Sequence, residues 1–166
     1  MKILHTITSL DKGGAENHLV ILAREQSLNN NKVSIYVSKN SFYWLKFLKK
    51  NKIKVFKSNF FNEKNFIYKI IKLVFDIYNL VLILKKNRPD IVHAHLPYME
   101  IVSYLSLFFV NSNTKFFISK HVDNVFFKGS DGQKKSSIGS LIAKIISIRA
   151  NKIIAISKAV KNFLSS

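Results

Sequence analysis

The chain of 166 residues contains no cysteine, only two prolines and only five glycines. Without cysteine there is no disulfide framework and no thiolate nucleophile, which fits a reducing compartment such as the cytosol. Few glycines and prolines, together with a hydrophobic fraction of 48% that includes fourteen phenylalanines, indicate a folded domain and exclude a disordered chain. At this length the sequence predicts one domain, residues 1–166, with a sizeable core.

Acidic residues are scarce as well. The chain has nine Asp and Glu residues and 27 Lys and Arg residues, which gives a formal net charge of +18. Lysine supplies nearly all of the positive charge, and the only arginines are Arg24, Arg88 and Arg149. Specific recognition of phosphates and bases prefers the bidentate guanidinium group, so no nucleic-acid partner is expected. Lysine point charges are sufficient for attraction to an anionic membrane surface.

The sequence also lacks a long uninterrupted hydrophobic run. The one candidate membrane span, Phe66 to Lys86, is broken by polar residues that share one stripe of a helix: Lys69, Lys72, Asp76 and Asn79. The remaining face of this helix is broad and apolar, so the helix is predicted to lie on a sheet. No signal-peptide cleavage site follows the N-terminus, and a cytoplasmic protein is expected.

Strand-like and helix-like segments alternate along the chain. The expected strands are Lys2–Thr8, Lys32–Ser38, Lys54–Phe56, Ile91–Ala94, Lys115–Ser119 and Lys152–Ile156. The expected helices are Glu16–Asn29, Ser41–Asn51, Asn65–Asn87, Tyr98–Phe109 and Ser136–Ala150. Such alternation predicts an α/β fold, a three-layer α/β/α Rossmann-like domain with a mostly parallel sheet.

The opening of the chain carries the most informative pattern. A hydrophobic strand runs into Asp11-Lys12-Gly13-Gly14-Ala15-Glu16, and an amphipathic helix follows. A strand, a glycine turn and a helix N-terminus form an anion site in α/β proteins, because backbone N–H groups can approach a phosphate. The spacing is not the dinucleotide pattern G-x-G-x-x-G, and a turn without a ligand is the alternative.

The end of the chain carries a different signal. Ile153–Ser157 is expected to be a buried strand that reaches a serine, and Lys158–Leu164 to begin a helix without a capping glycine or proline. A parallel-sheet domain rarely ends on a helix that has just begun, so the sequence is expected to be interrupted here.

Four short motifs follow one another in a definite order. They are Gly13-Gly14-Ala15-Glu16, Pro89-Asp90-Ile91-Val92-His93-Ala94-His95, Ser119-Lys120-His121 and Ile154-Ala155-Ile156-Ser157-Lys158-Ala159-Val160. Together they resemble the N-terminal half of family 4 glycosyltransferases, which are retaining enzymes of the two-domain GT-B fold. The resemblance covers essentially the whole chain.

The resemblance implies a domain on the acceptor side of an enzyme. In that family the N-terminal domain mainly holds the sugar acceptor, and its glycine loop faces the diphosphate of a nucleotide-sugar donor. The C-terminal domain binds most of the donor and carries a Glu-x7-Glu motif, which this sequence lacks. The expected function is therefore half of a transferase that acts on a lipid-linked, lipopolysaccharide-type or capsule-type glycan acceptor, inactive as this fragment alone.

The resemblance also assigns candidate site residues. His121 matches the catalytic-site histidine that faces the donor sugar, with a role in hydrogen bonding and orientation. The candidate substrate-binding residues are Gly13, Gly14, Glu16, His95 and Ser157. Many relatives have an acidic residue directly after the histidine, whereas here Val122 precedes Asp123, which leaves the role of Asp123 open.

Structural alternatives exist for several candidates. A histidine at a strand end, such as His121 or His95, is commonly a hydrogen-bonded packing residue, and Ser157 is most simply the N-cap of the final helix. His93 and His95 could point to one side of a strand, but the sequence shows no third metal ligand. Because the family is generally metal-independent at the catalytic step, neither a metal nor another cofactor is expected.

Two questions remain open at the level of sequence. The aromatic and basic run Phe42–Lys50 fits either a sheet-covering helix or a docking surface on the inner face of the cell membrane. The alternative function is a non-catalytic half that binds acceptor or membrane, or pairs with a separate donor-binding subunit, or is an inactive truncated product. A neighbouring reading frame that encodes a Glu-x7-Glu domain would favour a split or frameshifted enzyme.

Overall fold

A computed structural model describes residues 1–58, 65–110, 113–121, 137–158 and 160–161 of the chain. Its strands are β1 (Lys2–Ile7), β2 (Lys32–Val37), β3 (Lys54–Lys57), β4 (Ile91–His95), β5 (Lys115–Lys120) and β6 (Lys152–Ala155). Its helices are α1 (Gly14–Leu28), α2 (Leu45–Lys50), α3 (Phe66–Asn87), α4 (Pro97–Phe108) and α5 (Ser137–Arg149).

The strands form one sheet in the order β3-β2-β1-β4-β5-β6, and every neighbouring pair is parallel. From β1 the chain moves outward to β3, and α3 then carries it back to β4 on the other side of β1. The strand order therefore reverses between β1 and β4, where open α/β sheets bind their ligands at the carboxyl ends of the strands.

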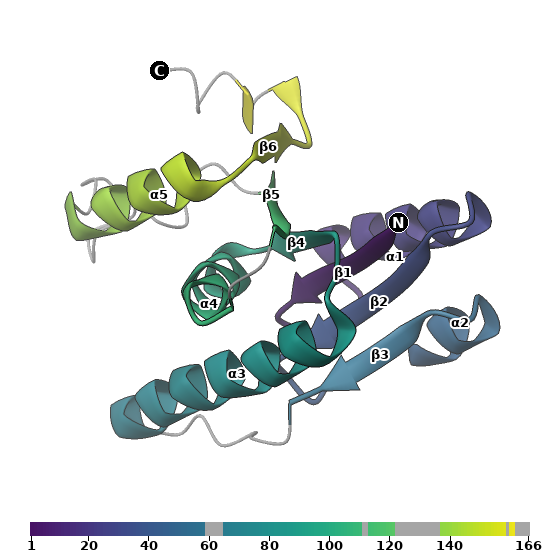
Figure 1. The fold of residues 1–166 in the computed structure, drawn as a ribbon, viewed down its shortest axis with the longest axis horizontal. Helices are drawn as coiled ribbons and strands as arrows, with labels where there is room; N and C mark the ends of the chain where they lie inside the picture. The colour runs from purple at the N-terminus through teal and green to yellow at the C-terminus, as the bar shows by residue number, and fades with distance from the viewer. Residues whose placement is uncertain (59–64, 111–112, 122–136, 159, 162–166) are drawn as a thin grey trace.

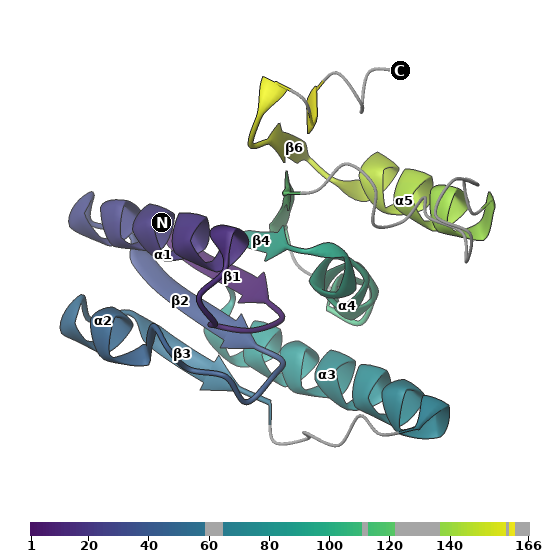
Figure 2. The ribbon, with the colours of Figure 1, turned by 180° about the vertical axis from the view of Figure 1, so that it is seen from behind.

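Helices cover both faces of the sheet, which gives three layers (Figures 1 and 2). One core lies between the sheet and α1 and α2 and includes Ile7, Leu19 and Leu48. The other lies beneath α3, α4 and α5 and includes Leu4 and Met99. Alternate residues of β1 thus enter opposite cores, and burial on both faces explains the continuous hydrophobic character of this central strand.

The alternation expected from the sequence is confirmed, since the six expected strands and the five helices between them occur close to their expected bounds. The last strand was wrongly expected to be buried, because Ile153 is 38% exposed at the edge of the sheet, and most of the expected helix Lys158–Leu164 lies outside the described residues. The largest difference is at α2, which begins at Leu45 instead of Ser41. Residues 41–44 are held by Leu10, whose N–H donates to the Ser41 carbonyl at 3.1 Å and which forms an isolated bridge with Phe42. These backbone bonds compete with the first helical turn.

The run Phe42–Lys50 covers the sheet. Leu48 is fully buried, and Phe42, Trp44 and Phe47 pack against the core beneath α1 and α2. Of the two interpretations left open by the sequence, the packing of these side chains favours the sheet-covering helix.

Helix α3 lies on the sheet, but part of its polar stripe faces inward. Asp76 is fully buried and accepts hydrogen bonds from the Tyr36 hydroxyl at 2.7 Å, the Ser38 hydroxyl at 2.6 Å and the Tyr98 hydroxyl at 2.7 Å. The Lys72 ammonium, 4% exposed, lies 3.0 Å from the same carboxylate. These charge-assisted bonds compensate for the burial of two charges.

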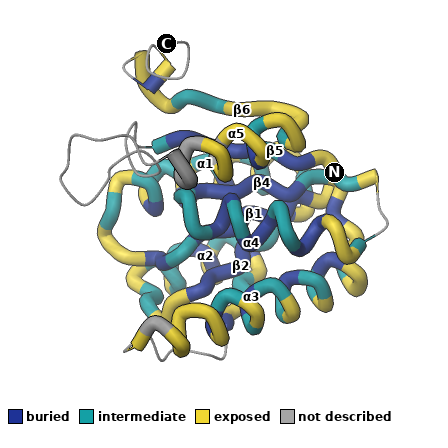
Figure 3. The backbone as a smooth tube through the Cα atoms, turned by 90° about the vertical axis from the view of Figure 1, so that its left-hand side faces the viewer, coloured by how far each residue is buried: buried dark blue, intermediate teal, exposed yellow. Residues whose placement is uncertain are grey.

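Leu80 and Leu84 of α3 lie in the core, and the opposite side of the helix, which is exposed in Figure 3, is also apolar. Its exposed residues form what we call the α3 outer stripe: Ile67, Ile70, Ile71, Val74, Tyr78 and Leu82. No helix among the described residues has the length and apolar character needed to span a membrane.

The Asp76 network gives a test of the fold. Replacing Asp76 with Ala leaves the Lys72 ammonium buried without its carboxylate, so the free energy of unfolding in urea should fall by about 3–5 kcal/mol. The double variant Lys72→Met with Asp76→Leu should lose less, because it removes both charges. As a control, Glu25→Ala at an exposed ion pair with Arg24 should change stability by less than about 1 kcal/mol. An Asp76→Ala protein as stable as that control would contradict the structure.

Candidate functional site

All five histidines of the chain gather on the α1 face of the sheet, near the carboxyl ends of β1, β4 and β5. Parallel register pairs His5 of β1 with His93 of β4. His95 lies on the same face as His93, because side chains two residues apart share one side of a strand. His121 follows β5, and His18 projects from α1 with its ring centroid 5.3 Å from that of His121.

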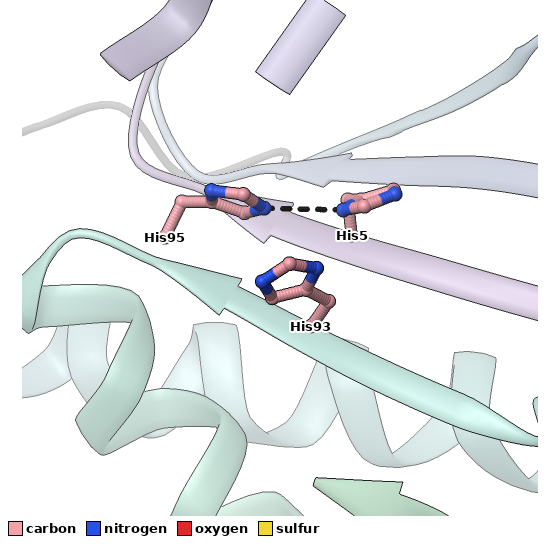
Figure 4. Close-up of side chains that lie close together, drawn as sticks. All are labelled: His5, His93 and His95. Carbon is pink, nitrogen blue, oxygen red and sulfur yellow. Dashed lines mark hydrogen bonds between the residues drawn. The ribbon is translucent and has the colours of Figure 1, made fainter. Parts of the chain in front are cut away.

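Hydrogen bonds join four side chains in a line, which we call the histidine row: Gln26, His5, His95 and His121. His5 Nε2 lies 2.7 Å from Gln26 Oε1, and His5 Nδ1 lies 3.1 Å from His95 Nε2, the contact drawn in Figure 4. His95 Nδ1 in turn lies 3.1 Å from His121 Nε2. His93 stands outside the row, with its Nε2 2.8 Å from the Ser119 hydroxyl.

Burial keeps these imidazoles uncharged. Desolvation lowers the pKa of His5 to about 4 and that of His93 to about 3, and repulsion from neighbouring histidines adds to the effect. The pKa of His95 is held well below its ordinary value for the same reasons. Desolvation and repulsion from His18 lower the pKa of His121 to about 4. At neutral pH the row therefore consists of neutral rings.

The predicted glycine loop leads directly into α1, which begins at Gly14 with Gly13 as its N-cap. Gly13 has φ −116° and ψ 162°, an extended conformation open to any residue, so the backbone angles do not require glycine. A Cβ on Gly13 would collide with the Glu16 carboxylate, whereas a Cβ on Gly14 would meet nothing within 4 Å. No side-chain hydrogen bond caps this helix N-terminus.

The other predicted site residues have structural partners. Glu16 is 8% exposed and accepts a hydrogen bond from the Ser9 hydroxyl at 2.8 Å, which fixes it behind Gly13. His95 is fully buried within the histidine row. Ser157 accepts the N–H of Val160 at 3.2 Å, so its expected N-cap bond is present. Asp123 and Val122 lie outside the described residues.

His121 and the glycine loop lie on the same face and edge of the sheet. His121 is half-buried at the end of β5, and its partner in ring contact, His18, is in the second turn of α1. The sheet thus brings together the two features that the sequence predicted to act at one site.

Sequence reasoning missed His5, His18 and Gln26, and it was wrong that His93 and His95 lack a third potential ligand. Two groups of three histidines have ligand nitrogens within 4.8 Å of one another: His5, His93 and His95, and His18, His95 and His121. Neutral imidazoles of this kind suit zinc. A metal would, however, have to replace the hydrogen bonds that already join the rings of the histidine row.

The backbone next to the histidines is strained at one residue and held in place by its neighbours. Leu96, directly after His95, has φ 71° and ψ 146°, a conformation that costs a non-glycine residue about 1–3 kcal/mol. Its carbonyl accepts the N–H groups of Met99 and Glu100 as α4 begins. The buried ion pair between Glu100 and Lys120 then ties α4 to the last residue of β5. Burial raises the pKa of Glu100, and the ammonium of Lys120 opposes that rise.

Comparison with known proteins gives these features a family context. The model of Glycosyltransferase Family 4 matches residues 12–166. Among solved structures, a glycosyltransferase from Rickettsia africae ESF-5 has a TM-score of 0.73 and 24% sequence identity over 98% of this chain. The lipopolysaccharide outer core galactosyltransferase WaaB has a TM-score of 0.69 and 16% identity over 99% of this chain. No curated protein sequence matches.

Proteins that are named for other reactions share this fold. A putative UDP-N-acetylglucosamine 2-epimerase from Listeria monocytogenes has a TM-score of 0.66 and 13% identity over 99% of this chain. This chain covers 38%, 42% and 41% of the Rickettsia, WaaB and Listeria proteins, less than half of each. At these identities the structural likeness establishes the fold alone. The family model matches nearly the whole sequence, and the chain belongs to Glycosyltransferase Family 4.

Proposed function

We propose that this domain is the acceptor-side half of a retaining glycosyltransferase, which moves a sugar from a nucleotide-sugar to a lipid-linked or lipopolysaccharide-type glycan. The observation that carries the proposal is that His121 and the uncapped N-terminus of α1 lie at one sheet edge, within a chain of this family. The likeness to a lipopolysaccharide outer core galactosyltransferase supports the acceptor class.

The chemistry of glycosyl transfer assigns roles to these two features. Negative charge builds on the departing diphosphate as the sugar becomes oxocarbenium-like, so oriented N–H donors lower the barrier. The backbone N–H groups that open α1 at Gly14 supply such donors without a competing side-chain cap. His121 orients the donor sugar by a hydrogen bond. We assign most of the contacts with the nucleotide to a C-terminal domain, on a continuation of this chain or on a separate subunit.

A cavity at the carboxyl ends of β1 and β2, beside α3, offers a place for the acceptor. It has a volume of about 300 Å³ and is lined by Thr8, Lys39, Lys69, Lys72 and Tyr98. Two of these residues, Lys69 and Lys72, belong to α3, whose outer stripe is apolar. The lining of the cavity is mainly apolar, and Lys39 and Lys69 border it, so it suits an acceptor that joins an anionic head group to a lipid. The α3 outer stripe, flanked by Lys85 and Lys86, would then rest on an anionic membrane surface.

Reconstitution tests the transferase assignment. The purified chain, incubated with radiolabelled nucleotide-sugars and a total lipid extract, should transfer no sugar, because donor binding needs the second domain. The same chain completed with a matching C-terminal domain should transfer sugar. In that enzyme, Gly14→Val should obstruct the approach of the diphosphate to the N–H groups that open α1, and His121→Ala should remove a hydrogen bond to the sugar. Each should lower turnover about a hundredfold, as expected when one oriented contact is lost in the transition state.

Two results would contradict this account of the site. Robust transfer by the isolated chain would overturn its assignment as half of an enzyme. Full activity of both variants, with circular dichroism showing an intact fold, would remove Gly14 and His121 from the site. Because a Cβ at position 14 meets open space, the fold of the Gly14→Val protein should be intact.

Membrane attachment is tested by sedimentation with vesicles. The chain should pellet with phosphatidylglycerol-containing vesicles, less so at high salt, because charge screening is strong over about 8 Å at physiological ionic strength. Val74→Glu in the α3 outer stripe should reduce the bound fraction about tenfold, through loss of apolar burial. Ile148→Glu on α5 is the matched control, because it makes the same charge change at a side chain that is 77% exposed.

Equal losses of binding in the Val74→Glu and Ile148→Glu proteins would show that α3 is not the docking surface. Equal pelleting with neutral and anionic vesicles, or none with either, would contradict the membrane proposal itself.

A further inference from the structure

The direction of the hydrogen bonds in the histidine row follows from its first member. Gln26 presents its carbonyl oxygen, which can only accept, 2.7 Å from His5 Nε2. With the amide in this orientation, His5 Nε2 carries the proton. A neutral imidazole has a single N–H group, so His5 Nδ1 is left with a lone pair and acts as an acceptor.

The donor and acceptor nitrogens of His95 and His121 follow from those of His5. Because His5 Nδ1 accepts, His95 Nε2 must donate across the 3.1 Å contact, and His95 Nδ1 becomes an acceptor. His121 Nε2 must then donate to His95 Nδ1, again over 3.1 Å. This leaves the proton of His121 on Nε2 and a lone pair on its Nδ1. Burial favours the neutral form of all three rings, as the lowered pKa values of His5, His95 and His121 indicate.

The last atom of the row has no partner within the described part of the chain. His121 Nδ1 is buried without a hydrogen bond, and so is Nδ1 of the neighbouring His18. Buried polar atoms in folded proteins are normally hydrogen-bonded, so an acceptor in this position indicates a missing donor. A sugar hydroxyl is a donor that a neutral imidazole can accept.

We propose that Gln26, His5 and His95 are positioning residues that hold His121 in its Nε2–H form, so that Nδ1 accepts a hydroxyl group of the substrate sugar. The identity of the substrate rests on the proposed function, whereas the state of the His121 ring does not. A sugar that lacks this hydroxyl would leave Nδ1 unpaired and would be selected against.

Reversing the row shows why Gln26 sets its direction. In the opposite arrangement His5 Nε2 would hold a lone pair facing the Gln26 carbonyl oxygen, and two acceptors at 2.7 Å repel each other unless the amide turns over to present its NH2 group. An acceptor at position 26 is therefore needed to place the proton of His121, which lies two rings away. Glutamate keeps that acceptor, and leucine removes it at similar size.

Nuclear magnetic resonance of the isolated chain reads the state of each ring nitrogen directly. Long-range correlations between ring protons and ¹⁵N should show His5, His95 and His121 with protonated Nε2 and unprotonated Nδ1 at neutral pH. Gln26→Glu should preserve the His121 pattern, and Gln26→Leu should convert it to a mixture of both neutral forms. Glu25→Gln, at the adjacent exposed position of α1, is the control and should change nothing.

Four outcomes would overturn the proposal. They are a proton on His121 Nδ1, a His121 imidazolium at neutral pH, no effect of Gln26→Leu in a protein with an otherwise unchanged spectrum, and a change of the ring signals when a chelator is added. The last result would mean that a bound metal, rather than the hydrogen bonds, determines the state of the rings.

Activity measurements separate this proposal from the proposed function. In the two-domain enzyme Gln26→Leu should lower turnover in proportion to the fraction of His121 that has lost its Nε2–H form, since a catalytic ring in the wrong tautomer loses its function. Gln26→Glu should retain the turnover of the unchanged enzyme. If the tautomers are as stated but no transfer occurs in any reconstituted enzyme, the proposed function fails and the positioning role stands. If transfer occurs but His121 does not respond to Gln26, the positioning role fails.

Discussion

The parallel pairing of β1 with β4 is the constraint on which the rest of the structure depends. It joins residues about ninety positions apart in the sequence, and its register places His5 opposite His93. The same pairing is where the strand order reverses, so α1 and α4 both begin at the edge where β1 and β4 end. The hydrogen bond between His5 and His95, at the centre of the histidine row, crosses this junction.

The two faces of the sheet solve the problem of buried polarity in different ways. On the α1 face, uncharged rings hydrogen-bond to one another, and the row ends at His121, which is half-buried. On the other face, ion pairs balance charge locally: Lys72 with Asp76, and Lys120 with Glu100. Charged pairs anchor helices to strand ends, whereas the row of neutral rings ends at His121 Nδ1, which has no hydrogen-bond partner among the described residues.

Most of the fold could be predicted from the sequence, because apolar periodicity and helix stops are local properties. Arg88 illustrates this: it precedes a proline and ends α3 in a left-handed conformation with φ 44°. The orientation of α3 could not be predicted, since the hydroxyls of Tyr36 and Ser38 that make its inward polar stripe favourable lie on and directly after a distant strand, β2. Hydrophobicity alone would turn that stripe outward.

The candidate site was predictable only in part, for the same reason. The glycine loop and His121 carry short motifs, and the structure brings them to one sheet edge. His5 carries no local signal, because its importance follows from the β1–β4 register. Gln26 likewise matters only because α1 runs back over β1 and brings residue 26 to residue 5. Contacts between distant segments supply what the sequence pattern lacks.

The central claim is that packing holds the histidines at this edge as neutral rings, and a pH titration of their ring protons tests it most directly. The account expects His5, His93, His95 and His121 to remain uncharged at about pH 5.5, well below the ordinary histidine pKa of about 6.5. Since unfolded histidines bind protons first, stability should also fall as the pH is lowered from about 6.5 toward 4. Four ordinary titrations near pH 6.5, with no such loss of stability, would contradict the account.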